Sequence, residues 1–350
     1  MAILHKPSVK FPEHVITMEQ TLQLAEQLHA NHPDLPLALQ LVRNAGVETR
    51  NVVQPLENAI EHPGFEERNR IHEREAKRFV PLVVAEALDN AGKTVTDIDL
   101  IIYVSCTGFM MPSMTAWMIN ELGFSPTTAQ IPIAQLGCAA GGAALARAQD
   151  FCRAHPGADV LIVSCEFCSL CYQPTDTSVG TLLSNGLFGD AIAAVVVSDE
   201  ASPHHAGISL LTNASYVIPG TVDWISYAVR ATGFHFQLDK RVPGTMEPLA
   251  PVLRDVVAAH GWDASKLDFY IIHAGGPRIL DDLSKFLDVA PYEFRYSRET
   301  LTTHGNIASA VVLDALRRLF DDDEVPKKGC GLIAGFGPGI TAEITLGEWV

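Results

Sequence analysis

Three side chains that lie far apart in the sequence could together carry out acyl transfer. Cys138 heads a segment of small residues that we expect to be a buried helix, whose unpaired N–H groups would favour the thiolate. His273 ends an apolar run just before two glycines, where open α/β sheets gather reactive groups. Asn306 follows Gly305 at the start of a second small-residue helix. We expect an imidazolium to keep the sulfur charged, and the imidazole and amide N–H groups to stabilise an oxyanion.

Each of these residues, taken alone, also has a plain structural interpretation. A small buried cysteine such as Cys138 packs well among alanines and glycines. His273 could be a core histidine whose ring nitrogens are hydrogen-bonded, and Asn306 could be a helix N-cap, a common position for asparagine. Only the combination of the three favours acyl transfer from a thioester, and that chemistry needs no pair of carboxylates. The sequence offers no persuasive pair.

A cysteine cluster and a glycine loop suggest other chemistry less strongly. Cys165, Cys168 and Cys171 have a spacing that could bind zinc or an iron–sulfur cluster, but no second such pair or histidine pair completes four ligands. Soft side chains that line a cavity explain them better, so we expect no metal and no bound cofactor. The glycine-rich residues 335–339 lack the ending and the helix of a phosphate-binding loop, and we interpret them as a tight turn beside a site.

The elements that must position these residues follow from hydrophobic patterning. Near-continuous apolar runs predict strands covered on both faces, at residues 97–108, 159–165, 191–198 and 267–276, with a last strand after 331–339. Helical patterns cover residues 18–44, 66–91, 138–151 and 305–320. We expect the first two of these helices to be exposed. The order of elements repeats after the connection at 201–205, which predicts two similar halves, residues 1–200 and 201–350.

Composition and charge exclude several classes of protein. The 350 residues are 47% hydrophobic and 19% charged, which rules out disorder and coiled coil. No run reaches the roughly 18 apolar residues needed to span a bilayer, and the N-terminus has no secretory pattern, so we expect a soluble, cytoplasmic protein. A net charge of −16 opposes contact with nucleic acid or an anionic membrane. Seven cysteines, an odd number, indicate free thiols.

Four motifs resemble the chalcone-synthase-type, or type III, polyketide synthases over nearly the whole chain. They are residues 136–142, 273–277, 305–306 and 335–343. The resemblance implies a thiolase-like fold of the α/β class, an αβαβα sandwich of two pseudo-repeated halves, in a homodimer. It also implies that Cys138 carries the growing chain as a thioester, while His273 and Asn306 polarise the carbonyl of malonyl-CoA and hold the enolate left by decarboxylation.

Within this family, three further segments are similar to the bacterial 1,3,6,8-tetrahydroxynaphthalene synthases. These segments are residues 103–112, 164–176 and 224–230. Enzymes of that type use malonyl-CoA as both starter and extender, join five units and cyclise the product, which oxidises to flaviolin. A synthase that starts from a fatty acyl-CoA and makes alkylpyrones or alkylresorcinols is the alternative.

The resemblance also implies a set of residues that line the substrate cavity. Cys106, Cys168 and Cys171 match positions that are threonines in the plant enzymes, Tyr227 stands where those have a glycine, and Ala308 replaces a small serine. We expect Tyr227 to narrow the starter end, to disfavour a bulky aromatic starter and to offer a hydroxyl to the malonyl carboxylate.

The resemblance also implies residues that control entry to the cavity and residues that bind coenzyme A, and both sets differ from those of the plant enzymes. Phe236 matches one gatekeeping phenylalanine, Ile208 occupies the other gatekeeper position, and Met111 should reach across the dimer interface into the neighbouring cavity. The basic cluster that binds the coenzyme A phosphates in plant enzymes is reduced to Arg43. Arg50 or Arg278 are further candidates for that contact.

Overall fold

The computed structural model describes residues 1–61, 63–199, 206–324 and 327–350, and its centre is one mixed sheet of ten strands. The connection expected at 201–205 lies outside the described residues. From edge to edge the strands are β12 (Phe269–Ile272), β13 (Cys330–Gly337), β14 (Gly339–Trp349), β9 (Ile208–Thr221), β1 (Ile3–Leu4), β8 (Asp190–Ser198), β7 (Asp159–Phe167), β5 (Ile98–Val104) and β6 (Ala129–Ile133), with β2 (Ser8–Lys10) beside β8.

The sheet consists of two wings that are joined by the short strand β1. Ile3 and Leu4 pair with β8 on one side and with β9 on the other, both antiparallel. Strand β5 runs parallel to β6 and β7, and β12 runs parallel to β13. Every residue of β7 and of β8 is buried, as the apolar runs predicted for strands covered on both faces.

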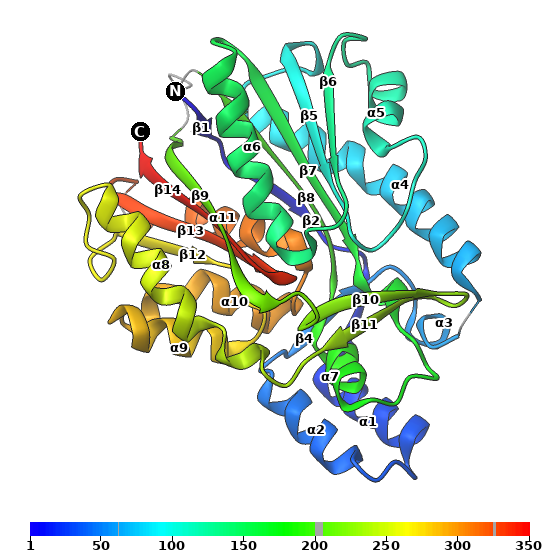
Figure 1. Cartoon of the computed structure of the whole chain (residues 1–350). Helices are drawn as coiled ribbons and strands as arrows, with labels where there is room; N and C mark the ends of the chain where they lie inside the picture. Colours follow the sequence, from blue (N-terminus) through cyan, green and yellow to red (C-terminus); the bar gives the residue numbers. More distant parts are fainter. Residues whose placement is uncertain (62, 200–205, 325–326) are drawn as a thin grey trace.

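Helices cover both faces of each wing, which gives five layers (Figure 1). The central layer is α6 (Ala140–Ala154) and α11 (Val311–Asp321), which pack between the wings. The outer layers are α4 (Phe65–Ala91) with α5 (Met114–Leu122) on one wing, and α8 (Met246–Ala259) with α9 (Pro277–Leu287) on the other. Neighbouring residues of a strand therefore face different layers: Ile102 packs in the central cluster and Ile101 in the cluster under α4. The expected αβαβα class is confirmed.

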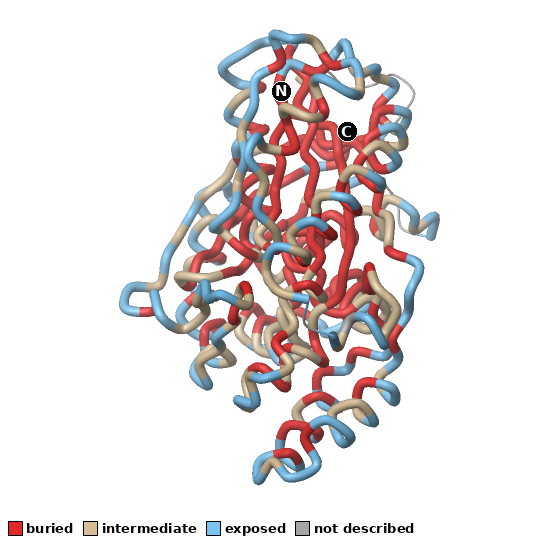
Figure 2. Tube along the Cα trace, turned by 90° about the vertical axis from the view of Figure 1, so that its right-hand side faces the viewer, coloured by how far each residue is buried: buried red, intermediate tan, exposed pale blue. Residues whose placement is uncertain are grey.

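A smaller lobe extends from one end of this sandwich, at the bottom of Figure 1. Its elements are α1 (Met18–His29), α2 (Leu35–Asn44), α3 (Leu56–Ala59), α7 (Val179–Leu187), the pair β3 (His14–Thr17) and β4 (Thr49–Val52), and the hairpin of β10 (Ile225–Arg230) and β11 (Gly233–Leu238). Figure 2 shows the buried backbone running through the central strands, with exposed residues along the outer helices.

Three sequence-based expectations about helices are corrected. Residues 18–44 form two helices and not one, because Pro33 lies in the break and a proline inside a helix removes a backbone hydrogen bond. Helix α4 is not an exposed helix, since one side of it, including Phe79 and Val83, is buried against the sheet. The helix expected from residue 305 begins only at Val311. No helix in the described ranges is both long and apolar enough to cross a bilayer.

Candidate active site

The three residues expected to do chemistry come from three separate elements and meet at one point. Cys138 lies in a 3-10 turn, Gly137–Ala139, directly before α6. His273 follows β12, and Asn306 follows α10 (Arg295–His304). The Oδ1 atom of Asn306 is 3.2 Å from Nε2 of His273 and 4.0 Å from Sγ of Cys138. The fold therefore brings a thiol, an imidazole and a carboxamide together.

The side-chain amide of Asn306 is held by the backbone around it. The backbone N–H of Asn306 donates to the carbonyl of Leu187 at 2.9 Å, and its backbone carbonyl accepts from the N–H of Gly189 at 3.1 Å. The N–H of Ala308 donates to Oδ1 at 3.0 Å. Within the described chain no hydrogen bond occupies Nδ2, so this nitrogen is available to a substrate. Asn306 is thus not a helix N-cap, because helix α11 starts five residues later.

An unusual backbone conformation at Ala308 makes this arrangement possible. Ala308 has a φ of 50°, in the left-handed region that residues other than glycine rarely adopt. The turn points its N–H at the Asn306 side chain, and helix α11 begins only after this turn, at Val311. Gly305 also has a positive φ, 72°, and a Cβ there would lie 2.5 Å from the carbonyl oxygen of Leu187. Such strained residues cluster at functional sites.

His273 is neutral in this site. Its side chain is 3% exposed, and burial lowers the pKa of the ring to about 4. Because the amide oxygen of Asn306 can only accept a hydrogen bond, Nε2 carries the ring proton and is a donor. The imidazole is therefore an N–H donor to the Asn306 amide, and burial shifts its pKa in the direction opposite to that of the expected imidazolium.

Burial also reverses the expected ionisation of Cys138. Desolvation and then the negative charge of Glu166 raise the pKa of the thiol to about 12, against smaller opposing effects of Asn306 and the local backbone. The direction of this shift is opposite to the one expected for a cysteine at a helix start. The reason is that Cys138 precedes α6 in a tighter turn and lies in a buried environment, where the uncharged form of a thiol is favoured.

An apolar cavity lies near Asn306, although none of the three residues is in its wall. Cys168, Cys171, Tyr227 and Phe236, all expected to line the substrate cavity, are in its wall. Phe188 is in the wall too, and its backbone forms an isolated bridge with Asn306. The cavity thus begins beside the catalytic amide. Its wall also includes residues of α1 and α2, among them Leu22, Leu28 and Val42.

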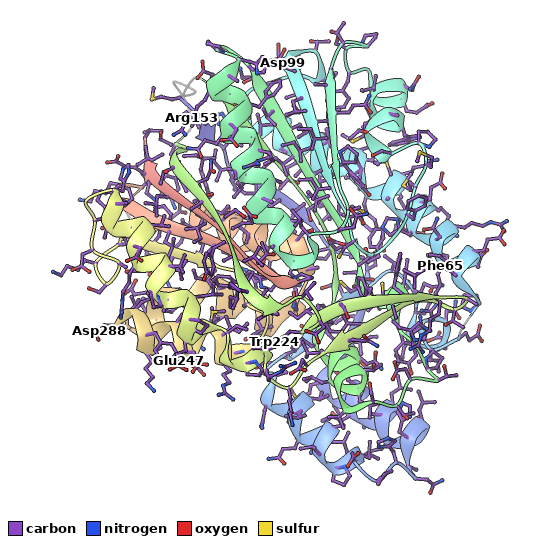
Figure 3. All side chains as sticks on the ribbon, in the orientation of Figure 1. Phe65, Asp99, Arg153, Trp224, Glu247 and Asp288 are labelled. Atoms are coloured by element: carbon purple, nitrogen blue, oxygen red, sulfur yellow. The ribbon has the colours of Figure 1, made fainter. Side chains whose placement is uncertain are left out.

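The β10–β11 hairpin forms one side of the cavity and is held by aromatic contacts. Tyr227 and Phe236 are cross-strand partners whose rings meet edge to face at 5.7 Å. Figure 3 shows Phe65 near the tip of the hairpin and Trp224 near its base. Phe65 packs edge to face against Phe234 at 5.2 Å, and the guanidinium of Arg241 lies over Trp224 at 4.6 Å.

Other sequence-predicted residues lie elsewhere. Ile208 is fully buried in β9 between Leu4 and Trp349, so it packs in the central core and not at the cavity, which corrects the gatekeeper expectation. Met111 is 83% exposed in the loop after β5. Arg50 is buried and donates to the carbonyls of Asn185 and Phe188, so it cannot meet a coenzyme phosphate at the surface.

Cys106 lies next to a carboxylate that sequence reasoning missed. Its Sγ is 3.6 Å from Oε2 of Glu166, which is fully buried in β7. A glutamate inside an otherwise apolar strand is the sequence signal that could have identified this carboxylate, because a glutamate is almost never fully buried unless it is paired. Among the described residues, no three His, Cys, Asp or Glu side chains are grouped as metal ligands.

Comparison with known proteins agrees with this geometry. The sequence matches the family of chalcone and stilbene synthases, with the N-terminal domain over residues 48–201 and the C-terminal domain over residues 209–348. It is 68% identical over 349 residues to the 1,3,6,8-tetrahydroxynaphthalene synthase of Streptomyces coelicolor, covering 100% of this chain and 92% of the relative. It is 64% identical to the enzyme of that name from Streptomyces griseus, covering 100% and 93%.

Solved structures give the same result. The crystal structure of the tetrahydroxynaphthalene synthase from Streptomyces coelicolor, a bacterial type III polyketide synthase, superposes with a TM-score of 0.97 at 67% identity, over 99% of both chains. Germicidin synthase from the same organism, also a type III polyketide synthase, superposes with a TM-score of 0.93 at 26% identity, over 100% of this chain and 99% of that chain.

Proposed function

Because the chain belongs to the chalcone and stilbene synthase family, as a type III polyketide synthase, we propose that it makes 1,3,6,8-tetrahydroxynaphthalene from malonyl-CoA. The enzyme is an acyltransferase that joins five malonyl units, with malonyl as both starter and extender, and cyclises the chain. The observation that carries the proposal is the meeting of Cys138, His273 and Asn306 beside an apolar cavity.

In this mechanism Cys138 carries the chain. The thiol attacks the thioester carbonyl of malonyl-CoA, loses its proton, and releases coenzyme A as the free thiol. The oxyanion that forms accepts a hydrogen bond from the Nδ2–H of Asn306 and a second one from His273, whose Nε2 proton turns from Oδ1 of Asn306 to the oxyanion. Two such preorganised donors in a water-poor site are worth several kcal/mol to the transition state.

The same two donors serve chain extension. The next malonyl-CoA loses its carboxylate as CO2, and the electron pair stays on the thioester as an enolate that both N–H groups stabilise. The carbanion then attacks the acyl group on Cys138 and the sulfur is released. In an apolar site the carboxylate lacks the water that would stabilise its charge, and its loss as CO2 is therefore favoured. The neutral state of His273 suits this role, because a neutral imidazole keeps its Nε2 proton as a donor.

The wall of the cavity accounts for the choice of starter. The ring of Tyr227 stands beside Phe236 and narrows the space, and its hydroxyl, which hydrogen-bonds the Cys171 thiol, would bind the carboxylate of a malonyl starter. Cys168 and Cys171 supply soft surface around the growing chain. A bulky aromatic starter has little room beside these groups.

We also propose that the enzyme works as a cytoplasmic homodimer. The loop that carries Met111, 83% exposed, also carries Phe109, 61% exposed. Large apolar side chains on one protruding loop favour burial against a partner, and a second copy would cover them. Mass photometry of wild type and of Met111→Asp tests this, with loss of the dimer expected in the variant.

Purified protein supplied with malonyl-CoA alone tests the reaction. We expect CO2 release and a coloured product with the mass of flaviolin. Cys138→Ser should abolish the coloured product, while His273 and Asn306 still support CO2 release, whereas Cys330→Ser, which changes a half-exposed thiol on β13, should leave both unchanged. Condensation by the Cys138 variant would contradict the mechanism. Products formed only when a fatty acyl-CoA is added would contradict the substrate.

A further inference from the structure

Arg68 is a buried cation that forms no ion pair with an Asp or Glu of the described residues. It lies in the first turn of α4, and its side chain is only 4% exposed. Burial of a charge is costly unless the charged group is well hydrogen-bonded. The reaction proposed above does not use this arginine, so its position needs another explanation.

The guanidinium of Arg68 binds backbone carbonyls. Its Nη1 donates to the carbonyl of Leu170 at 2.7 Å and also to that of Tyr172, and its Nη2 donates to the carbonyl of Glu61 at 3.4 Å. Leu170 lies in the 3-10 turn Cys168–Cys171, and Tyr172 directly follows it. Buried carbonyls outside the regular ladders need a donor, and a planar guanidinium can serve several at once. Arg68 therefore fixes the course of the chain at this turn.

This 3-10 turn is part of the cavity wall. Cys168, Cys171 and Tyr172 all line the cavity. At the start of the turn, the N–H and the hydroxyl of Ser169 donate to the two carboxylate oxygens of Asp190 at 2.8 and 2.5 Å. The turn is thus held at its start by a buried carboxylate and at its end by the guanidinium of α4.

The held turn contacts the β10–β11 hairpin, which forms another part of the wall. The thiol of Cys171 hydrogen-bonds the hydroxyl of Tyr227, and Nε2 of Gln173 donates to the carbonyl of Phe234 at 3.1 Å. Phe65, at the start of α4, packs edge to face against Phe234 at 5.2 Å. The first turn of α4, the 3-10 turn and the hairpin therefore form one connected unit, and movement of the turn would displace the partner of the Tyr227 hydroxyl.

We propose that Arg68 is a positioning residue for the choice of starter. By binding the carbonyls on either side of Cys171, it keeps that thiol against the hydroxyl of Tyr227 and so fixes the direction in which the hydroxyl meets the carboxylate of a malonyl starter. Without the guanidinium, the two buried carbonyls lose their donor and the turn shifts. His273 and Asn306 belong to other elements, so decarboxylation itself does not depend on Arg68. This inference rests on the function proposed above.

Competition between two starters measures this effect. The enzyme is supplied with malonyl-CoA and hexanoyl-CoA, whose acyl group has no carboxylate, and the products primed by each are weighed by mass spectrometry. Only folded enzyme makes either product, so their ratio does not depend on how much of a variant is folded. In Arg68→Gln we expect the ratio of hexanoyl-primed to malonyl-primed product to rise about fivefold, which corresponds to about 1 kcal/mol, the contribution of one hydrogen bond.

A double-mutant cycle tests whether Arg68 acts through Tyr227. Tyr227→Phe should raise the same ratio by a similar factor, and the double variant should exceed neither single variant, because both changes remove the same interaction. An unchanged ratio in Arg68→Gln would overturn the proposal. So would two factors that multiply in the double variant, or a shift in Arg68→Gln when Tyr227→Phe has none, since Arg68 would then act independently of the hydroxyl.

A matched control separates position from stability. Leu88 is buried on the same helix, about 30 Å along its axis from Arg68, and is not in the cavity wall. Leu88→Ala should lower the melting temperature, as loss of a buried leucine does, and leave the product ratio as in wild type. If this variant shifts the ratio as much as Arg68→Gln does, general destabilisation explains the effect and the proposal is wrong.

Arg68→Lys keeps the proposal testable if the glutamine variant does not fold. Lysine retains the charge but not the planar fork, so it can replace only part of the carbonyl contacts. Its ratio should lie above that of wild type and below that of Arg68→Gln, and a wild-type ratio would contradict us. The two hypotheses fail separately: a wild-type enzyme that makes no coloured product from malonyl-CoA refutes the function, whereas a coloured product with unchanged ratios refutes only the role of Arg68.

Discussion

Asn306 and His273 are 33 positions apart in the chain, yet Oδ1 of the first lies 3.2 Å from Nε2 of the second. The contact fixes both groups at once. It assigns the ring proton to Nε2, and with the Ala308 N–H on the same oxygen it turns the amide nitrogen away toward the substrate. The amide N–H is thus oriented before any substrate binds, and the imidazole N–H lies beside it, where it can turn from Oδ1 to an oxyanion or an enolate.

Removing the amide should affect chemistry more than folding. Asn306→Ala loses one oxyanion donor and the group that orients His273, so we expect kcat for malonyl-CoA decarboxylation to fall about 100- to 1000-fold. The backbone bonds of residue 306 with Leu187 and Gly189 remain, so the melting temperature should change little. Release of labelled CO2 measures the first effect. Asn120→Ala, on the exposed side of α5, is the control and should keep full activity.

The positive φ of Ala308 predicts which substitutions the protein tolerates at this position. Glycine adopts a φ of 50° without strain, whereas a β-branched residue does not. We expect Ala308→Gly to retain activity and stability within about 1 kcal/mol, and Ala308→Val to lose about 1–3 kcal/mol of unfolding free energy together with activity. Urea unfolding and CO2 release measure the two. A valine variant as stable as the glycine variant would mean that the turn is not strained.

Tyr227 should control the choice of starter more than stability. Tyr227→Phe keeps the ring that packs on Phe236 and removes only the hydroxyl, so malonyl priming should fall several-fold with little change in melting temperature. Tyr227→Gly opens the space that the ring occupies, and an aromatic acyl-CoA should become a starter. Competition between malonyl-CoA and an aromatic acyl-CoA, with products weighed by mass spectrometry, separates the two effects. Identical product profiles in all three proteins would contradict this assignment.

Acid sensitivity should depend on a buried histidine outside the catalytic group. The ring of His72 contacts the hydroxyl of Ser105, and burial lowers its pKa to about 4 from an ordinary value of 6.5. Between these values the unfolded chain binds the proton and the folded chain does not, so stability falls as the pH drops below 6.5. Proton binding to the unfolded chain lowers the free energy of unfolding by about 2 kcal/mol at pH 5.

The measurement is the loss of melting temperature between pH 7.5 and pH 5. It should be smaller in His72→Gln than in wild type, because glutamine does not titrate. His14→Gln, at an exposed position of β3, is the control and should leave the pH dependence as it is. A His72 variant with the wild-type pH dependence would show that this ring is not the group responsible.

Much of the fold and the identity of the reacting side chains could be predicted from the sequence alone. The apolar runs that form β5, β7 and β8 are local signals, because a strand that is covered on both faces has apolar residues at nearly every position. The catalytic residues could be identified because Cys138, His273 and Asn306 each lie among glycines and small residues, and together they have the side chains that acyl transfer requires. These features depend on neighbours within a few positions.

Only the tertiary structure determined the protonation states and the neighbours of these groups. Whether Cys138 is a thiol and His273 neutral depends on how much water the surrounding elements exclude, and those elements come from the whole chain. The same holds for Glu166, whose partner Ser309 is 143 positions away, and for Ile208, which the family resemblance placed at the cavity and the sheet register buries beside Trp349. Desolvation and long-range contact are collective properties of the packed chain, so no local pattern of residues contains them.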